Sequence, residues 1–131
     1  MITLQEMTTR KELKAFVKFP FKLYENNKYW VPPIINDELD SFDKTKNPVF
    51  EHAEARFFIA FKNNEIVGRI AAIINYSAVK GQKLKKMRFG WFDFIDDIEV
   101  SKMLLNKVEE IGKQNKLEFM EGPVGFSNLD K

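Results

Sequence analysis

The sequence has 131 residues, of which 21 are basic and 19 acidic, giving a net charge of +2, with one histidine and no cysteine. These numbers exclude a disulfide framework, a thiolate nucleophile and a zinc cluster, and the charge is too balanced to indicate nucleic-acid binding. There is no apolar signal sequence and no run approaching the ~18 apolar residues that span a bilayer. The sequence therefore predicts one cytoplasmic domain over residues 1–131, without a metal site and without a nucleic-acid or membrane partner.

The first part of the chain predicts a short strand and then a helix. Residues 2–7 alternate apolar and polar side chains, as in a half-buried strand. Thr9 and Glu12 match a capping box, in which the two side chains satisfy free backbone N–H groups at the helix start. Pro20 is expected to end or kink this helix near Phe19, because proline lacks the N–H group and crowds the preceding turn.

The middle of the chain predicts a loop, a short helix and a pair of antiparallel strands. Residues 29–33 are aromatic and proline-rich, so they either pack across the core or form a partly exposed binding rim, and packing is favoured. Residues 34–42 suit a second helix. Residues 55–61 and 66–75 read as strands joined by a turn at 62–65, whose asparagines tolerate positive φ. The second of these strands is apolar almost throughout and is expected in the interior of a sheet.

The last part of the chain predicts a strand, a long helix and a second strand parallel to the first. Residues 76–88 are rich in lysine, and a solvated loop is favoured there over an anion-binding one. Residues 89–95 form the strand and residues 98–115 the amphipathic helix. A short strand at 117–120 follows a helical crossover, so it should run parallel to the strand at 89–95.

Acidic residues mark the junction between the strand at 89–95 and the helix that follows it. A helix start of this kind commonly binds phosphate, because its free N–H groups point at the ligand. Here the junction carries Asp96, Asp97 and Glu99. Carboxylates stabilise a helix start but repel a diphosphate, each contact at ~4 Å costing on the order of 4 kcal/mol before screening.

The order of these elements resembles the first two-thirds of the GNAT acyltransferase fold. In that superfamily the loop after the fourth strand carries Gln or Arg, two residues, Gly, any residue, and Gly or Ala, and a Leu-Leu pair usually follows. Counting back from Leu104 and Leu105 places Asp96, Glu99 and Ser101 at the three motif positions. The spacing of the motif is kept, but the acidic Asp96 stands where the motif has Gln or Arg, and the acidic Glu99 stands where it has Gly.

Three longer segments extend this resemblance over nearly the whole chain. They are KFPFKLYENNKYWVPP, FDFIDDIEVSKMLL and EGPVGFSNLD, which resemble a group of bacterial GNAT-like proteins of unassigned substrate. The resemblance implies a single α/β domain of GNAT-like fold, with a mixed, mostly antiparallel sheet and flanking helices. It also implies that the C-terminal part of the fold, with the usual tyrosine general acid, is lacking here.

The resemblance implies an N-acetyltransferase that uses acetyl-CoA or another acyl-CoA. Asp93 and Glu121 are then the carboxylates placed to face the cleft as acid or base, although either could equally point at solvent. By alternation, the side chain of Asp93 should lie on the sheet face opposite Phe92 and Phe94. The residues expected to contact the cofactor are Phe94, Ile95, Asp96, Asp97, Ile98, Glu99 and Ser101.

A second function class stays open beside the enzyme. The chain could be a non-catalytic binding or assembly module, in which the acidic helix start and residues 29–33 contact a protein partner. It could also form a homo-oligomer that completes its sheet by pairing with a second copy. The reversed motif favours this second class, and the fold favours the first.

Overall fold

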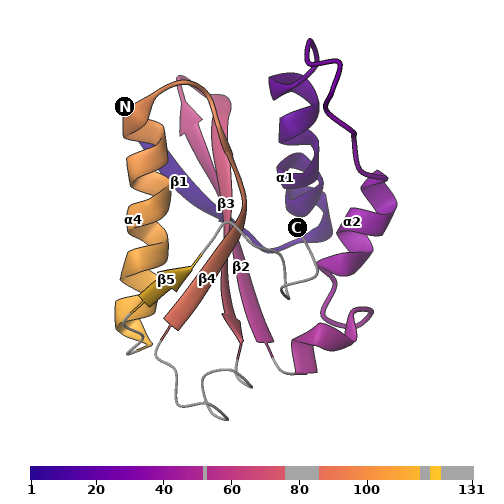
Figure 1. Cartoon of the computed structure of the whole chain (residues 1–131), viewed down its shortest axis with the longest axis vertical. Coiled ribbons are helices and arrows are strands. Elements are labelled where there is room, and N and C mark those ends of the chain that lie inside the picture. The colour runs from indigo at the N-terminus through magenta and orange to yellow at the C-terminus, as the bar shows by residue number, and fades with distance from the viewer. Residues whose placement is uncertain (52, 76–85, 116–118, 122–131) are drawn as a thin grey trace.

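A computed structural model describes residues 1–51, 53–75, 86–115 and 119–121 of the chain, with only the backbone described at positions 75, 86 and 119–121. It contains a five-stranded sheet with the strands in sequence order, covered by helices on both faces (Figure 1). β1 to β4 are antiparallel neighbours and β5 runs parallel to β4, as predicted. The elements are β1 Ile2–Met7, α1 Arg10–Leu23, α2 Ile35–Ser41, a 3₁₀ helix Pro48–Glu51, β2 Ala53–Lys62, β3 Glu65–Asn75, β4 Lys86–Phe94, α4 Ile98–Gln114 and β5 Phe119–Glu121.

The sheet separates two apolar cores. On one face α1 and α2 pack against the alternate residues Phe57, Ile59 and Ile73 of β2 and β3. On the other face α4 packs against the intervening residues, such as Phe58 and Ile70. Because β3 contributes to both cores, it is the interior strand that its continuous apolar run predicts.

The local signals at the two ends of α1 have different outcomes. The capping box is confirmed, because Thr9 Oγ1 accepts a hydrogen bond from the Glu12 amide at 3.1 Å and Glu12 Oε1 accepts one from the Thr9 amide at 3.1 Å. Of the two outcomes predicted for Pro20, an end or a kink, the structure excludes an end near Phe19, because α1 continues to Leu23 with Pro20 inside it. A proline inside a helix removes one hydrogen-bond donor, and here the acceptor left over, the Phe16 carbonyl, is satisfied by a buried side chain.

The hairpin between β2 and β3 and the start of β4 fix the register of the sheet. Asn63 and Asn64 have φ values of 53° and 65°, as the turn prediction requires. β4 begins at Lys86, so the strand takes in the last three residues of the lysine-rich segment, while residues 76–85 lie outside the described part of the chain.

A β-bulge in β4 decides which side chains face α1. Arg69 pairs with Asp93 and Ala71 with Gly90, so the single residue Ile70 opposes two residues of β4. One of these two, Trp91, has a positive φ of 46°. Beyond the bulge, Phe92 and Phe94 pack on the α4 face and Asp93 reaches the α1 face. The predicted orientation of Asp93 is therefore confirmed.

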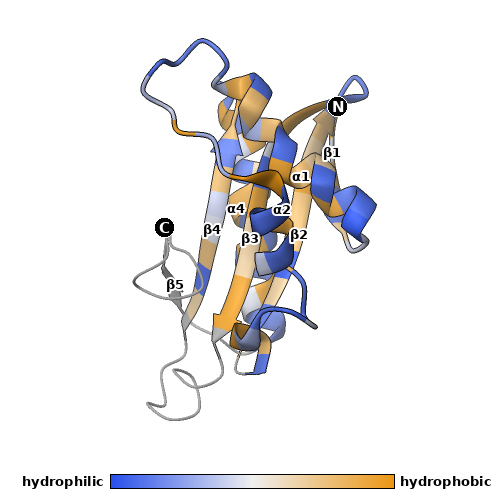
Figure 2. Ribbon diagram, turned by 90° about the vertical axis from the view of Figure 1, so that its right-hand side faces the viewer, coloured by the Kyte–Doolittle hydropathy of each residue, from blue (hydrophilic) through white to orange (hydrophobic). Residues whose placement is uncertain are grey.

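The loop between α1 and α2 is partly packed and partly exposed, and a binding role for it stays a prediction. Trp30 packs against Phe21 and Tyr24, with ring centroids 5.1 Å and 5.6 Å apart. Tyr29 and Val31 are 82% and 83% exposed, and the loop extends away from the body of the domain (Figure 2). Within the described ranges, no helix is both long and apolar enough to cross a membrane.

Candidate functional site

The candidate site lies along the outer edge of β4, on the side away from β3. β5 pairs with β4 from Lys86 to Arg88 only, where Arg88 is opposite Glu121. Further along, Phe89, Gly90, Asp93 and Phe94 pair with β3, and none of the described strands pairs with these four residues on the other side. The backbone donors and acceptors of such a strand edge can bind a ligand or another strand. The Glu121 side chain, predicted to be catalytic, lies outside the described residues.

Asp93 is held beside this edge by two side chains. Arg69 places Nε and Nη2 each 2.9 Å from Asp93 Oδ2. The Tyr24 hydroxyl donates to Asp93 Oδ1 at 2.7 Å. Arg69 is only 7% exposed, and its remaining nitrogen, Nη1, donates to the Phe16 carbonyl at 2.9 Å. Both oxygens of Asp93 thus have a fixed donor, which orients the carboxylate.

Protonation states in this cluster follow from burial. Burial, followed by the hydrogen bond to Asp93, raises the pKa of Tyr24 to about 12. Burial also lowers the pKa of Arg69, and the charge of Asp93 opposes that change. At neutral pH Tyr24 is therefore a neutral phenol that donates to Asp93, and Arg69 is a cation, since an arginine keeps its charge in proteins.

Trp91 brings a second carboxylate to the same side of β4. Its Nε1 donates to Glu38 Oε1 of α2, and its ring packs edge-on against Phe42 with centroids 5.1 Å apart. Asp93 thus bonds to the Tyr24 phenol, and Glu38 to the Trp91 indole, whose ring packs on Phe42 at the end of α2. Carboxylates beside aromatic faces are suited to a cationic group such as an ammonium.

Sequence reasoning found Asp93 and missed the residues that position it. Arg69 carried the available signal, because it is the only charged residue among the apolar residues between Ile66 and Ile74. A buried charge of this kind requires a partner. Tyr24, Glu38 and Trp91 gave no comparable signal.

An acidic residue of the chain itself caps the start of α4. Asp97 is the N-cap, and its Oδ1 accepts a hydrogen bond from the Glu99 amide at 3.0 Å. Its Oδ2 lies 3.1 Å from Lys62 Nζ, at the end of β2. The Lys62 hydrogen bond, followed by that of the Glu99 amide, lowers the pKa of Asp97. Ser101 Oγ donates back to the Ile98 carbonyl at 3.0 Å, so it too is engaged within the helix.

The other predicted cofactor contacts are divided between the core and the surface. Phe94 packs on the α4 face, and the Ile95 amide donates to the Val67 carbonyl at 2.9 Å. Asp96 is exposed, and Ile98 is 66% exposed. These residues lie together at one end of the sheet, as the sequence predicts.

The site fits one part of an acyl-CoA and not another. At the helix start, Asp97 pairs with Lys62 and already uses the Glu99 amide, while Asp96 and Glu99 add two exposed carboxylates. This arrangement does not fit a diphosphate. The amide groups of a pantetheine arm do match the backbone edge at Phe89, Gly90, Asp93 and Phe94.

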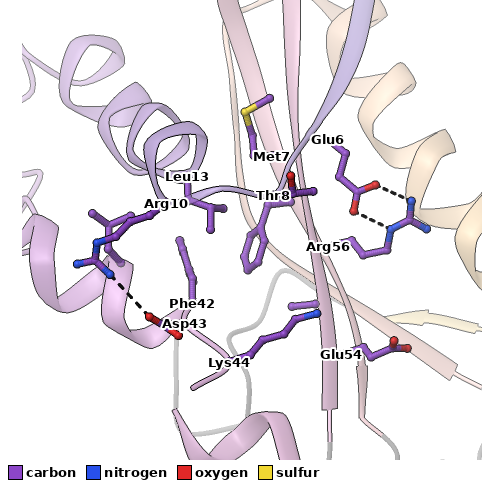
Figure 3. Close-up of a pocket in the computed structure, with 13 residues that line it drawn as sticks. Glu6, Met7, Thr8, Arg10, Leu13, Phe42, Asp43, Lys44, Glu54 and Arg56 are labelled. Carbon is purple, nitrogen blue, oxygen red and sulfur yellow. Dashed lines mark hydrogen bonds and ion pairs between the residues drawn. The ribbon is translucent and has the colours of Figure 1, made fainter. Parts of the chain in front are cut away.

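Two cavities lie away from Asp93. One, of about 520 Å³, opens between the ends of β1 and β2 and the helices α1 and α2 (Figure 3). Of its charged lining residues, Glu6 pairs with Arg56 and Arg10 with Asp43, and Lys44 and Glu54 also line it. The other, of about 580 Å³, lies between α1 and Ile95 and is lined largely by apolar side chains. No group of three histidine, cysteine or acidic side chains in the described part of the chain could hold a metal ion.

Two curated proteins are similar to this chain in sequence. It is 32% identical over 118 residues to protein YghO of Escherichia coli, covering 90% of this chain and 30% of that protein. It is 28% identical over 120 residues to the bacterial ceramide synthase of Caulobacter vibrioides, covering 91% of this chain and 31% of that protein. The chain thus spans about 30% of the length of the curated relatives it matches. No protein-family model matches it.

Solved structures share the arrangement of the strands and helices. An acetyltransferase of Clostridium acetobutylicum, solved with acetyl-CoA, has a TM-score of 0.64 at 15% identity and matches 92% of this chain and 79% of its own. A tandem GNAT protein from the clavulanic acid biosynthesis pathway has a TM-score of 0.63 at 10% identity, over 89% of this chain and 34% of its own. The chain therefore has the GNAT fold, that of the superfamily of acetyltransferases to which these structures belong.

Proposed function

We propose that this chain contributes the amine-binding site of an acyl-CoA-dependent N-acyltransferase. The observation that carries this proposal is the Asp93 carboxylate, fixed between Arg69 and Tyr24 beside the open edge of β4. The GNAT fold supports the reaction class. The similarity to a ceramide synthase supports the substrate class, because a ceramide is the amide of a long-chain amino alcohol with a fatty acid.

The residues on this face can do three things for such a reaction. Asp93 attracts the substrate ammonium and can accept the proton that the nitrogen must lose before it forms an amide bond. Glu38 adds a second negative charge on the same side of β4, near Trp91. Tyr24 stays protonated at neutral pH and keeps the Asp93 carboxylate oriented.

The acyl donor supplies a thioester, whose carbonyl carbon becomes the amide carbon as the thiol leaves. The open β4 edge is the surface that would hold its pantetheine arm. Because α4 begins with Asp96, Asp97 and Glu99, we expect little affinity to come from the diphosphate. Calorimetry should therefore give similar affinities for acetyl-CoA and acetyl-pantetheine, and an Asp96→Arg, Glu99→Gly variant should gain affinity for acetyl-CoA alone.

The reaction itself is tested by measuring release of free thiol from acetyl-CoA or palmitoyl-CoA in the presence of sphinganine, a long-chain amino alcohol. Asp93→Asn should reduce the rate by about 100-fold, the size of a typical acid–base contribution. Glu6→Gln is the matched control, since Glu6 pairs with Arg56 away from this site. A protein that releases no thiol with either donor, or an Asp93→Asn variant as active as the unmodified chain, would overturn the proposal.

A second function rests on the same open edge. A non-catalytic module could add a strand from a protein partner, or from a second copy of the chain, along residues 89–94. The acidic start of α4 favours this alternative, because it lacks the phosphate-binding chemistry of an acetyltransferase. The two functions compete for one edge, so they make opposite predictions about acyl-CoA and self-association.

A further inference from the structure

We infer that Pro20 is a positioning residue for Asp93, which it controls through the Phe16 carbonyl and the Arg69 guanidinium. The inference rests on the amine-binding role proposed for Asp93. It concerns a residue that makes no contact with that carboxylate and whose position inside a helix is otherwise unfavourable.

The first step is the hydrogen bond that Pro20 cannot make. In an α-helix the carbonyl of residue 16 accepts from the amide of residue 20. Proline has no such amide, and its ring crowds the carbonyl four residues earlier, which favours a tilt of that carbonyl away from the helix axis. Phe16 is fully buried, so its carbonyl would be left without a partner inside the core.

The second step is the donor that takes the vacant place. Arg69 Nη1 reaches the Phe16 carbonyl from β3 at 2.9 Å, and the guanidinium carbon lies 4.9 Å from the centre of the Phe16 ring. The guanidinium is a rigid plane, so fixing one nitrogen fixes the direction of the others. Those others, Nε and Nη2, both point at Asp93 Oδ2.

The third step joins the two ends of the network on one helix. Phe16, Pro20 and Tyr24 are spaced four residues apart, so they follow one stripe of α1. The same stripe therefore supplies the carbonyl that orients Arg69 and the hydroxyl that donates to Asp93 Oδ1. An ordinary residue at position 20 would bring back an amide that competes with Arg69 for the Phe16 carbonyl.

Pro20→Ala tests the inference, with Pro48→Ala as the control because Pro48 begins the 3₁₀ helix and is not part of the hydrogen bonds that join Phe16, Arg69, Asp93 and Tyr24. The first readout needs no substrate. It is the hydrogen exchange of the Arg69 side-chain N–H signals by NMR, assigned from their loss in Arg69→Lys. We expect exchange about 10-fold faster in Pro20→Ala and unchanged in Pro48→Ala.

The second readout is the KM for sphinganine in the thiol-release assay. Pro20→Ala should raise it about 10-fold, because a small displacement of a binding group is costly, while the urea midpoint stays the same or rises. In an Arg69→Lys background, Pro20→Ala should add nothing further. An unchanged Arg69 signal, an unchanged KM, or an equal effect of Pro20→Ala with Lys at position 69 would overturn the inference. Absence of activity in the unmodified chain would instead overturn the proposed function, and the NMR readout would still decide the role of Pro20.

Discussion

The ion pair between Arg69 and Asp93 differs from the other cross-strand pair, Arg56 with Glu6, mainly in its exposure. The side chains of the first pair are 8% and 17% exposed, and those of the second are 43% and 33% exposed. Removing one partner of a buried pair leaves an uncompensated charge in the core, whereas a surface pair is already solvated.

We therefore expect Arg69→Met to lower the free energy of unfolding by about 3–5 kcal/mol. The same substitution at Arg56 should lower it by about 1 kcal/mol or less. Urea unfolding of the two variants measures both values. Equal losses would show that the Arg69 pair is solvated, and would weaken the argument that Asp93 is held in a fixed place.

For a single residue, the sequence predicts which face of the sheet a side chain lies on better than it predicts the hydrogen-bond partners of that side chain. The position of Asp93 opposite Phe92 and Phe94 follows from alternation along one strand, which is local information. Its two donors are 69 and 24 residues away in sequence, at the C-cap of α1 and in β3. Only the three-dimensional fold brings them together, so the site around Asp93 was not predictable beyond the aspartate itself.

The close approach of α4 to β3 depends on a glycine. A Cβ atom at Gly68 would lie 2.8 Å from side-chain carbons of both Leu104 and Val100, and 3.3 Å from Phe94 Cβ. Gly68→Ala should therefore lower the free energy of unfolding by about 1–3 kcal/mol, the usual cost of overpacking a core. Thermal or urea unfolding measures the loss. The double variant Gly68→Ala, Val100→Ala should lose less than the sum of its single variants, and a simple sum would contradict this packing explanation.

The capping carboxylate at the start of α4 makes a pH-dependent contribution. Lys62 and the Glu99 amide lower the pKa of Asp97 below its usual value of 3.8. A lowered pKa stabilises the fold above the unfolded-state value, and that contribution disappears as the pH falls through the folded-state value. The urea midpoint of the unmodified chain should thus exceed that of Asp97→Asn at pH 7 and converge on it near pH 2. A difference that persists at pH 2 would show that the carboxylate charge is not responsible.

Elements whose hydrogen bonds and backbone angles depend on residues close by in sequence were predictable. The capping box of α1 and the Asn63–Asn64 turn depend only on neighbouring backbone groups, and both are present. The uninterrupted run of α1 through Pro20 was not decided by neighbouring residues, because the donor that replaces the lost amide of Pro20 comes from Arg69 in β3. The partner of Asp97 at the start of α4 was likewise not predictable, because Lys62 reaches it from β2, 35 residues away in sequence.

At the scale of the whole molecule, the feature that matters most for the site is that β4 has nine residues and β5 only three. β4 extends well beyond the three residues that pair with β5, and no described strand pairs with Phe89, Gly90, Asp93 or Phe94 on the side away from β3. An open strand edge invites either a ligand or another strand. At the same end of the sheet, the acidic start of α4 discourages phosphate groups.

Self-association is therefore expected to depend on whether an acyl donor is present. Two copies joined along residues 89–94 would cover the surface proposed for the pantetheine arm, so the two events exclude one another. Sedimentation velocity over a range of protein concentrations should show a dimer that dissociates when palmitoyl-CoA is added. Palmitate is the control, since it has the chain without the amide groups that match the strand edge. A dimer that persists at saturating palmitoyl-CoA would contradict the shared edge and favour the assembly module, whereas a monomer at every concentration would leave the edge to the acyl donor alone.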